Sequence, residues 1–177
     1  MMSPELTPTS GALRIAFPPV AGEDARVLVL GSLPGEESLR RGEYYAKAQN
    51  RFWWIMGQVF GAGPELPYAA RCARLTQNGI ALWDVCAAAE RLGSLDSAIV
   101  AASVIPNDFA AFLTQHSAIR RIAFNGRKAE QLFLRHVLSD LPRELAALPR
   151  VTLPSTSPAH AGMPANAKLA AWRAGLG

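Results

Sequence analysis

The sequence predicts an α/β protein of three layers, α/β/α, with a central, mainly parallel sheet of about four strands. Short apolar runs alternate along the chain with longer segments of helical character, and this alternation is typical of β-α-β units. A length of 177 residues suits one domain. Because crossovers between parallel strands are right-handed, we expect the loops after the strands to emerge at one edge of the sheet.

Four short apolar runs are the predicted strands. They cover residues 26–30, 80–85, 120–124 and 151–153. The first is aliphatic and partly β-branched and ends at Gly31, as expected of a buried strand followed by a tight loop. Residues 1–25 contain four prolines and little periodicity, which predicts a loosely ordered arm. A short edge strand around 13–17 is the alternative, and residues 26–177 form the predicted domain.

The predicted helices lie between these strands and after the last one. They cover residues 51–60, 68–77, 106–115, 127–138 and 168–173. Pro106 is expected near the first turn of its helix, where proline is tolerated. Residues 95–100 are read as loop and a helical turn, and 141–149 as a proline-bounded connection with some helical character.

Three polar or glycine-containing loops follow predicted strands and should therefore meet at one sheet edge. They are residues 31–35, 125–126 and 154–158. Ligands of open α/β sheets bind outside the carboxyl ends of the strands. Gly31 and Gly35 lack a Cβ, so this backbone can approach a ligand closely. The sequence therefore predicts a binding site at this edge.

Composition limits the chemistry of the site. The formal net charge is +4 and the pI about 9.5, which is compatible with a polyanionic partner but shared by many other enzymes. Two cysteines, Cys72 and Cys86, are too few for a four-cysteine cluster, and we expect buried thiols, with no metal and no cofactor. No apolar run is long enough to span a membrane, so no membrane partner and a cytoplasmic location are expected.

Three motifs carry a family resemblance. They are GSLPG at 31–35, YYAKAQNRFW at 44–53 and LPSTSPA at 153–159. In order and spacing they resemble the uracil-DNA glycosylase superfamily, most closely its hypoxanthine-DNA glycosylase branch, with the mismatch-specific uracil glycosylases as nearest relatives. The likeness runs from about residue 26 to 172. It implies a monomeric, monofunctional glycosylase that excises deaminated bases, hypoxanthine first, from double-stranded DNA.

Asn50 is the candidate catalytic residue. Its carboxamide can donate and accept hydrogen bonds, and so can contact a base edge or hold the attacking water. Asparagine immediately before a helix is also a favoured N-cap, and this alternative is the stronger one from residue chemistry alone. The resemblance implies the catalytic role. No lysine in the three motifs is placed as a Schiff-base former, so water is the expected nucleophile.

The first loop and the aromatic segment provide the candidate base-binding residues. The resemblance implies that Tyr45 stacks on the extruded base; a surface Tyr-Tyr pair is the alternative. At Leu33 the mismatch-specific enzymes have an asparagine that positions water, so leucine argues against efficient uracil excision, unless it is simply a packed loop residue. The full set is Ser32, Leu33, Pro34, Gly35, Tyr45 and Phe52.

The candidate DNA-binding residues are cations, short hydroxyl side chains and a loop histidine. Serine and threonine hydroxyls suit phosphate oxygens, and cations at a helix N-terminus favour an anion. Solvated surface loops are the alternative reading throughout. The set is Lys47, Asn125, Arg127, Lys128, Ser155, Thr156, Ser157, Pro158 and His160. Lys47-Ala48 replaces an expected His-Pro, which affects the predicted shape of this loop.

Three rival functions remain open from the sequence. The first is a uracil or mismatch-specific uracil-DNA glycosylase. The second is a noncatalytic nucleic-acid-binding domain with the same fold. The third is a hydrolase of free nucleosides.

Overall fold

The computed structural model describes residues 12–177 and confirms the α/β fold around a parallel sheet. Four strands pair in the order β3-β2-β6-β7, and every pair is parallel. Their bounds are Val27–Gly31 for β2, Ile80–Asp84 for β3, Arg121–Asn125 for β6 and Arg150–Leu153 for β7. Every residue of β2 and β3 is buried, which explains why both strands read as continuous apolar runs.

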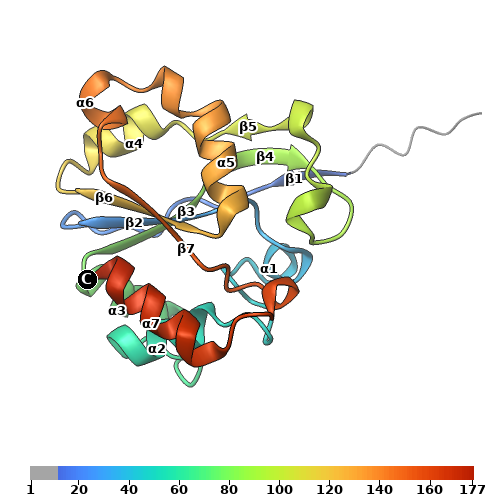
Figure 1. Cartoon of the computed structure of the whole chain (residues 1–177), viewed down its shortest axis with the longest axis vertical. Coiled ribbons are helices and arrows are strands. Elements are labelled where there is room, and N and C mark those ends of the chain that lie inside the picture. The colour runs from blue at the N-terminus through green and yellow to red at the C-terminus, as the bar shows by residue number, and fades with distance from the viewer. Residues whose placement is uncertain (1–11) are drawn as a thin grey trace, which may run out of the picture.

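Helices cover both faces of this sheet (Figure 1). One face carries α2 (Phe52–Phe60), α3 (Tyr68–Gln77) and α7 (Ala165–Leu176), and the other carries α4 (Phe109–Gln115), α5 (Arg127–His136) and α6 (Arg143–Ala146). Side chains of β2 alternate between the two cores: Val27 and Val29 pack with the first set of helices, Leu28 and Leu30 with the second. This alternation is the period of two expected of a strand.

A second, antiparallel sheet was not predicted. It consists of β1 (Leu13–Ile15), β4 (Cys86–Glu90) and β5 (Ile105–Pro106), with β4 in the middle. The alternative of an edge strand in the N-terminal segment is therefore observed at β1. Val20 also forms an isolated bridge to Leu82, so the described part of the expected arm is tied to the domain. Residues 1–11 of that arm lie outside the described residues.

Helix boundaries differ from the prediction in several places. Pro106 belongs to β5, and α4 begins at Phe109, because the Asp108 side chain caps it by accepting a hydrogen bond from the Ala111 amide at 3.0 Å. The short helix α1 (Glu36–Arg41) was missed. Single 3-10 turns occur in the connections, at η1 (Asp96–Ala98), η2 (Ala101–Ser103), η3 (Leu138–Asp140) and η4 (Pro158–His160).

The strand register brings the predicted loops together. Gly31 pairs with Asp84, and Asn125 pairs with Leu153, at the carboxyl ends of the four strands. The segments that follow β2, β6 and β7 therefore start at one edge of the sheet. No helix in residues 12–177 is long and apolar enough to cross a membrane.

Candidate active site

A cavity of about 430 Å³ lies at this carboxyl edge, within the size range of ligand pockets. Its walls come from the loop after β2 with the start of α1, the segment before α2, the turn around η1 and the loop after β7. Strand ends β3 and β6 contribute Asp84 and Asn125. The lining residues are Gly31, Ser32, Leu33, Pro34, Gly35, Glu36, Glu37, Ser38, Tyr44, Tyr45, Lys47, Asn50, Asp84, Ser94, Leu95, Asp96, Asn125, Ser155, Thr156, Ser157, Pro158 and Ala159.

A buried arginine fixes the first loop through hydrogen bonds to its main chain. Arg91 is 0% exposed and donates through its guanidinium to the main-chain carbonyl oxygens of Leu33, Pro34 and Gly93. The five N–H donors of a guanidinium suit such multiple contacts. The loop therefore has a fixed shape, and Arg91 ties it to the turn that follows β4.

Leu33 lines the cavity, but its side chain belongs to the core. It is 6% exposed and packs in the cluster on the α4–α5 side of the sheet. Ser32 is also buried, and its hydroxyl donates to Asp96 Oδ1 at 2.6 Å. The buried position of Leu33 agrees with the alternative in which it is a packed loop residue.

Tyr45 has a backbone conformation that is unusual for a residue other than glycine. Its φ is 53°, a value that few residues other than glycine adopt. Its ring stacks on Phe52 at 4.1 Å between centroids, and its hydroxyl is buried with no hydrogen-bond partner among the described residues. Burial and then the nearby Asp84 charge raise the pKa of Tyr45, so its hydroxyl stays protonated. Phe52 is fully buried behind Tyr45, outside the cavity lining.

Gly31 accounts for the close approach of two polar side chains. A Cβ at this position would meet the Asp84 carboxylate directly and would lie 2.9 Å from the Tyr45 hydroxyl. Any larger residue would displace one of them. The sequence predicted that this glycine allows a ligand to approach the backbone; in the structure, two side chains of the protein itself lie at this position.

Asn50 lies on the cavity wall and also supports the start of α2. Its Oδ1 accepts a hydrogen bond from the Phe52 amide at 2.9 Å. The neighbouring Arg51 amide donates to the Thr156 carbonyl at 3.0 Å, which joins this segment to the second motif. The structure places the N-cap of α2 at Arg51, one residue later than the sequence predicted, and Arg51 makes no side-chain capping hydrogen bond. Asn50 therefore supports the start of α2 from the residue before the cap.

The second motif is built by reciprocal hydrogen bonds. The Asn125 side chain donates to Thr156 Oγ1 and accepts from the Thr156 amide, both at 2.9 Å. From α7, the buried Lys168 donates to the carbonyl oxygens of Ser155 at 2.8 Å and His160 at 2.6 Å. Asn125 and Thr156 therefore shape the loop, while Ser155, Ser157 and Pro158 form its half-buried cavity side.

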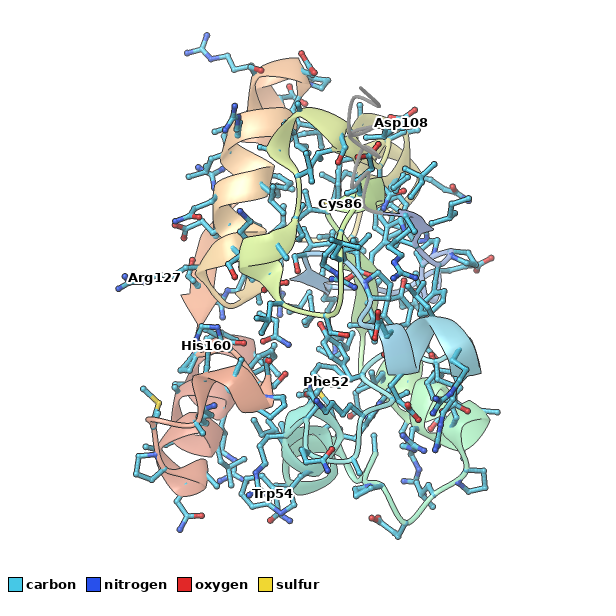
Figure 2. The ribbon with its side chains drawn as sticks, turned by 90° about the vertical axis from the view of Figure 1, so that its right-hand side faces the viewer. Phe52, Trp54, Cys86, Asp108, Arg127 and His160 are labelled. Atoms are coloured by element: carbon cyan, nitrogen blue, oxygen red, sulfur yellow. The ribbon has the colours of Figure 1, made fainter. Side chains whose placement is uncertain are left out.

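The cations and the histidine are distributed around the cavity rather than inside it. Lys47 lines the rim and is exposed. Arg127 projects away from the body of the protein, and His160 lies on the loop beside it in this view (Figure 2). Arg127 and His160 are exposed and Lys128 is half-buried, and none of the three lines the cavity.

The sequence reasoning missed the four carboxyl groups that line the cavity, those of Glu36, Glu37, Asp84 and Asp96. Asp84 is 3% exposed, and its Oδ2 has no hydrogen-bond partner among the described residues. Asp96 also lines the cavity. Burial, and then the Asp96 charge, raise the pKa of Asp84 to about 7, although Arg91 opposes the shift. The position of Asp84 at the carboxyl end of a predicted strand was the signal that could have identified it.

Nothing in residues 12–177 forms a group of three or more histidine, cysteine, aspartate or glutamate side chains that could hold a metal ion. Cys86 is buried in β4, and burial chiefly raises its pKa to about 12. Cys72 is half-buried on α3, and both thiols are free.

Comparison with known proteins assigns this arrangement to a family. The model of the uracil DNA glycosylase superfamily matches residues 18–174. The chain belongs to this superfamily. The match covers all of the central sheet and every loop of the cavity, so the three motifs lie within one continuous region of likeness.

Relatives with assigned names agree with this membership. A hypoxanthine DNA glycosylase of Methanosarcina acetivorans is 39% identical over 118 residues, which are 66% of this chain and 73% of that protein. A hypoxanthine DNA glycosylase of Methanosarcina barkeri is 36% identical over 114 residues, 64% and 71% of the two chains. The solution NMR structure of a proposed uracil DNA glycosylase from M. acetivorans superposes with a TM-score of 0.73 at 32% identity, covering 92% of this chain and 98% of that chain.

Proposed function

We propose that this protein is a monofunctional DNA glycosylase that excises deaminated bases, hypoxanthine first, from double-stranded DNA. The observation that carries the proposal is the single cavity in which the two superfamily loops meet Tyr45 and Asn50. The names of the two relatives favour hypoxanthine over uracil as the preferred base. The buried Leu33 agrees with them, because it presents no carboxamide to a water molecule.

Excision requires that the nucleotide leave the helix. Extruding a base costs a few kcal/mol, and the pocket must compensate for lost stacking and pairing. Tyr45 lines the cavity, and its ring stacks on Phe52 with 4.1 Å between the ring centroids. Base stacking on an aromatic side chain contributes about 1–3 kcal/mol. In the proposal, Tyr45 supplies this stacking surface, and Phe52 acts only through Tyr45.

The bond to the sugar breaks as negative charge develops on the base and positive charge on C1′. Preorganised donors aimed at the developing charge lower such barriers. Asn50 lines the cavity and provides a carboxamide whose Oδ1 accepts a hydrogen bond from the Phe52 amide at 2.9 Å, which restricts the rotation of the side chain. We assign Asn50 the catalytic role of contacting the base or the attacking water.

We propose that the DNA backbone binds at the rim of the cavity. Ser155, Ser157 and Pro158 present the second motif, and Lys47 also lines the cavity, whereas Arg127, Lys128 and His160 do not line it. Phosphate contacts position a protein on DNA without reading sequence. Asn125 and Thr156 shape this surface through their mutual hydrogen bonds. The proposed enzyme acts as a monomer and needs no cofactor.

A gel assay tests the proposal and separates its rivals. Matched duplexes carrying one deoxyinosine, one uracil or only normal bases are incubated with enzyme and then cleaved at abasic sites, and free inosine is tested in parallel. Strand cleavage that is fastest for deoxyinosine supports the proposal. Faster cleavage at uracil indicates the uracil glycosylase, hydrolysis of free inosine alone indicates the nucleoside hydrolase, and duplex binding without cleavage indicates a noncatalytic domain.

A further inference from the structure

Asp84 is a buried carboxyl group that the proposed mechanism does not yet use. It ends β3, lines the cavity and is 3% exposed. Its Oδ2 is sealed from solvent and has no hydrogen-bond partner in the described part of the chain. Buried polar groups of folded proteins are nearly always satisfied, so an exception at the wall of a cavity needs an explanation.

No counter-ion neutralises Asp84 within residues 12–177. The three ion pairs found there involve Arg14, Arg40 and Arg41 on the surface. The positive charge of Arg91 acts on Asp84, but the Arg91 guanidinium donates to three main-chain carbonyl oxygens. A buried carboxyl group without a paired cation or a donor holds its proton, because charging it in a poorly solvated site is costly.

The groups packed around Asp84 strengthen this tendency. Asp96 faces the same cavity and is fixed by the Ser32 hydroxyl at 2.6 Å. Its charge adds to burial in raising the pKa of Asp84 to about 7, with Arg91 acting in the opposite direction. Tyr44, Tyr45 and Cys86 are the titratable neighbours that sense the charge on Asp84, and the pKa of each is raised. All three are therefore neutral near pH 7 and supply no competing charge.

We propose, building on the proposed excision of hypoxanthine, that Asp84 is the general acid of the reaction and gives its carboxyl proton to N7 of the departing base. The C1′–N9 bond breaks, and its electron pair moves onto the purine, which takes up the proton and leaves neutral. Water adds its oxygen to C1′ and releases a proton, and Asp84 recovers a proton from solvent. The sum is hydrolysis, with no further reactant.

The position and chemistry of Asp84 fit this role. An acid is most effective when it is still protonated at the working pH yet donates readily, and general acid catalysis contributes about 10²- to 10⁴-fold in rate. A purine gains more than uracil from such an acid, because its imidazole ring offers a basic nitrogen outside the sugar bond. Asp84 therefore links the pocket to the purine preference of the enzyme.

The test is the pH dependence of single-turnover excision from a deoxyinosine duplex, for wild type and Asp84→Asn. The wild-type rate should fall as pH rises through about 7, because the acid loses its proton. Asp84→Asn should be slower by about 10²-fold or more below pH 7, and its profile should lack this decline. Equal shapes of the two profiles would overturn the proposal. Absence of excision by wild type at every pH would instead refute the proposed function.

A matched variant separates acid catalysis from local structure. Asp96→Asn removes the neighbouring charge but leaves Asp84 in place, so the decline of the rate should move to lower pH. If the rate declined at the same pH as in wild type, the decline would not come from a proton on Asp84 that senses the Asp96 charge, and the proposal would lose this support. Thermal unfolding of both variants checks whether they remain folded.

A substrate that needs no acid gives the second readout. A deoxyinosine methylated at N7 carries a positive charge on its base, and cleavage of the C1′–N9 bond releases neutral 7-methylhypoxanthine without a proton being gained. For this substrate, Asp84→Asn should lose less than about 10-fold, against 10²-fold or more for deoxyinosine. If wild type excises both substrates and the variant loses both equally, Asp84 is a base contact or a packing residue and the proposal fails.

Discussion

At the scale of single residues, the site uses side chains for two purposes at once. Asn50 fixes the start of α2 through the Phe52 amide and lines the cavity. Tyr45 stacks on Phe52 and also lines the cavity. Substitutions at such positions change stability and activity together, so a useful experiment must measure both.

Asn50→Ala should lower the single-turnover rate of deoxyinosine excision by about 10²-fold or more, since it removes a preorganised contact to the transition state. Loss of the hydrogen bond from the Phe52 amide alone costs about 1 kcal/mol of stability. Melting temperature and rate are measured on the same preparation. A near-normal rate with a lowered melting temperature would show that Asn50 only supports the start of α2.

Asp108→Ala is the matched control for this experiment. Asp108 caps α4 through the Ala111 amide, and Figure 2 shows it toward the other end of the molecule from Phe52. The control variant should lose about the same stability and keep the wild-type rate. A comparable loss of rate would mean that cap loss alone disturbs the site.

Asp84 should make stability depend on pH in a defined direction. Its folded pKa is raised to about 7, above the unfolded value of about 3.9, so the folded protein binds more protons between these values. The free energy of unfolding of wild type should therefore decrease as pH rises from about 4 to 7. In Asp84→Asn this component should disappear. Denaturant titrations of both proteins at pH 5 and pH 8 check it, and identical pH dependence in the two would contradict the assignment.

At the scale of elements, the parallel sheet followed from the sequence and the second sheet did not. The strands β2, β3 and β6 are apolar runs, because helices bury both of their faces. The strand β4 reads Cys-Ala-Ala-Ala-Glu, a composition with low strand preference. Its pairing with β1 and β5 comes from tertiary contacts that a single sequence does not display.

The sequence also predicted only part of the candidate site: its three loops, but not its buried charged residues. The three loops were identified because glycine, proline and short polar residues follow strands, and the topology brings such loops to one edge. Asp84, Arg91 and Lys168 were missed, because charged residues are expected at the surface and their burial depends on partners far along the chain. Phe52 was placed in the base contact, whereas it lies behind Tyr45.

The clamp formed by Arg91 gives a prediction for the first loop. Arg91→Lys keeps the positive charge but cannot satisfy three carbonyl oxygens with the planar fork of arginine. We expect a loss of about 2–4 kcal/mol in stability, because each buried unsatisfied group costs about 1–3 kcal/mol. Amide hydrogen exchange at residues 31–35 should become faster. Unchanged exchange in this loop would show that Arg91 does not hold it.

At the scale of the whole molecule, one edge of the sheet carries the cavity and the other carries arginines. A second cavity, at the amino ends of the strands, is lined by Arg26, Arg120, Arg121 and Arg173 among other residues. The formal net charge of +4 is thus spread over the molecule rather than gathered at the proposed site. The location of DNA must therefore be tested directly and not inferred from total charge.

Salt dependence measures how many phosphates the protein contacts. If about four cations around the site contact DNA, duplex affinity should fall about 10²-fold between 50 and 200 mM salt. The double substitution Arg127→Gln and Lys128→Gln should reduce the slope of log affinity against log salt by about two. Fluorescence anisotropy with labelled duplex provides both slopes. An unchanged slope in the variant would remove α5 from the DNA footprint.

The most direct measurement is the structure of the Asn50→Ala variant bound to a duplex with one deoxyinosine. We expect the hypoxanthine to be extruded into the cavity between the loop at residues 31–35 and the loop at residues 155–158, stacked against Tyr45 and within hydrogen-bond distance of Asp84. A base that stays in the helix over this cavity, or DNA bound at the arginine-lined cavity at the opposite sheet edge, would contradict it.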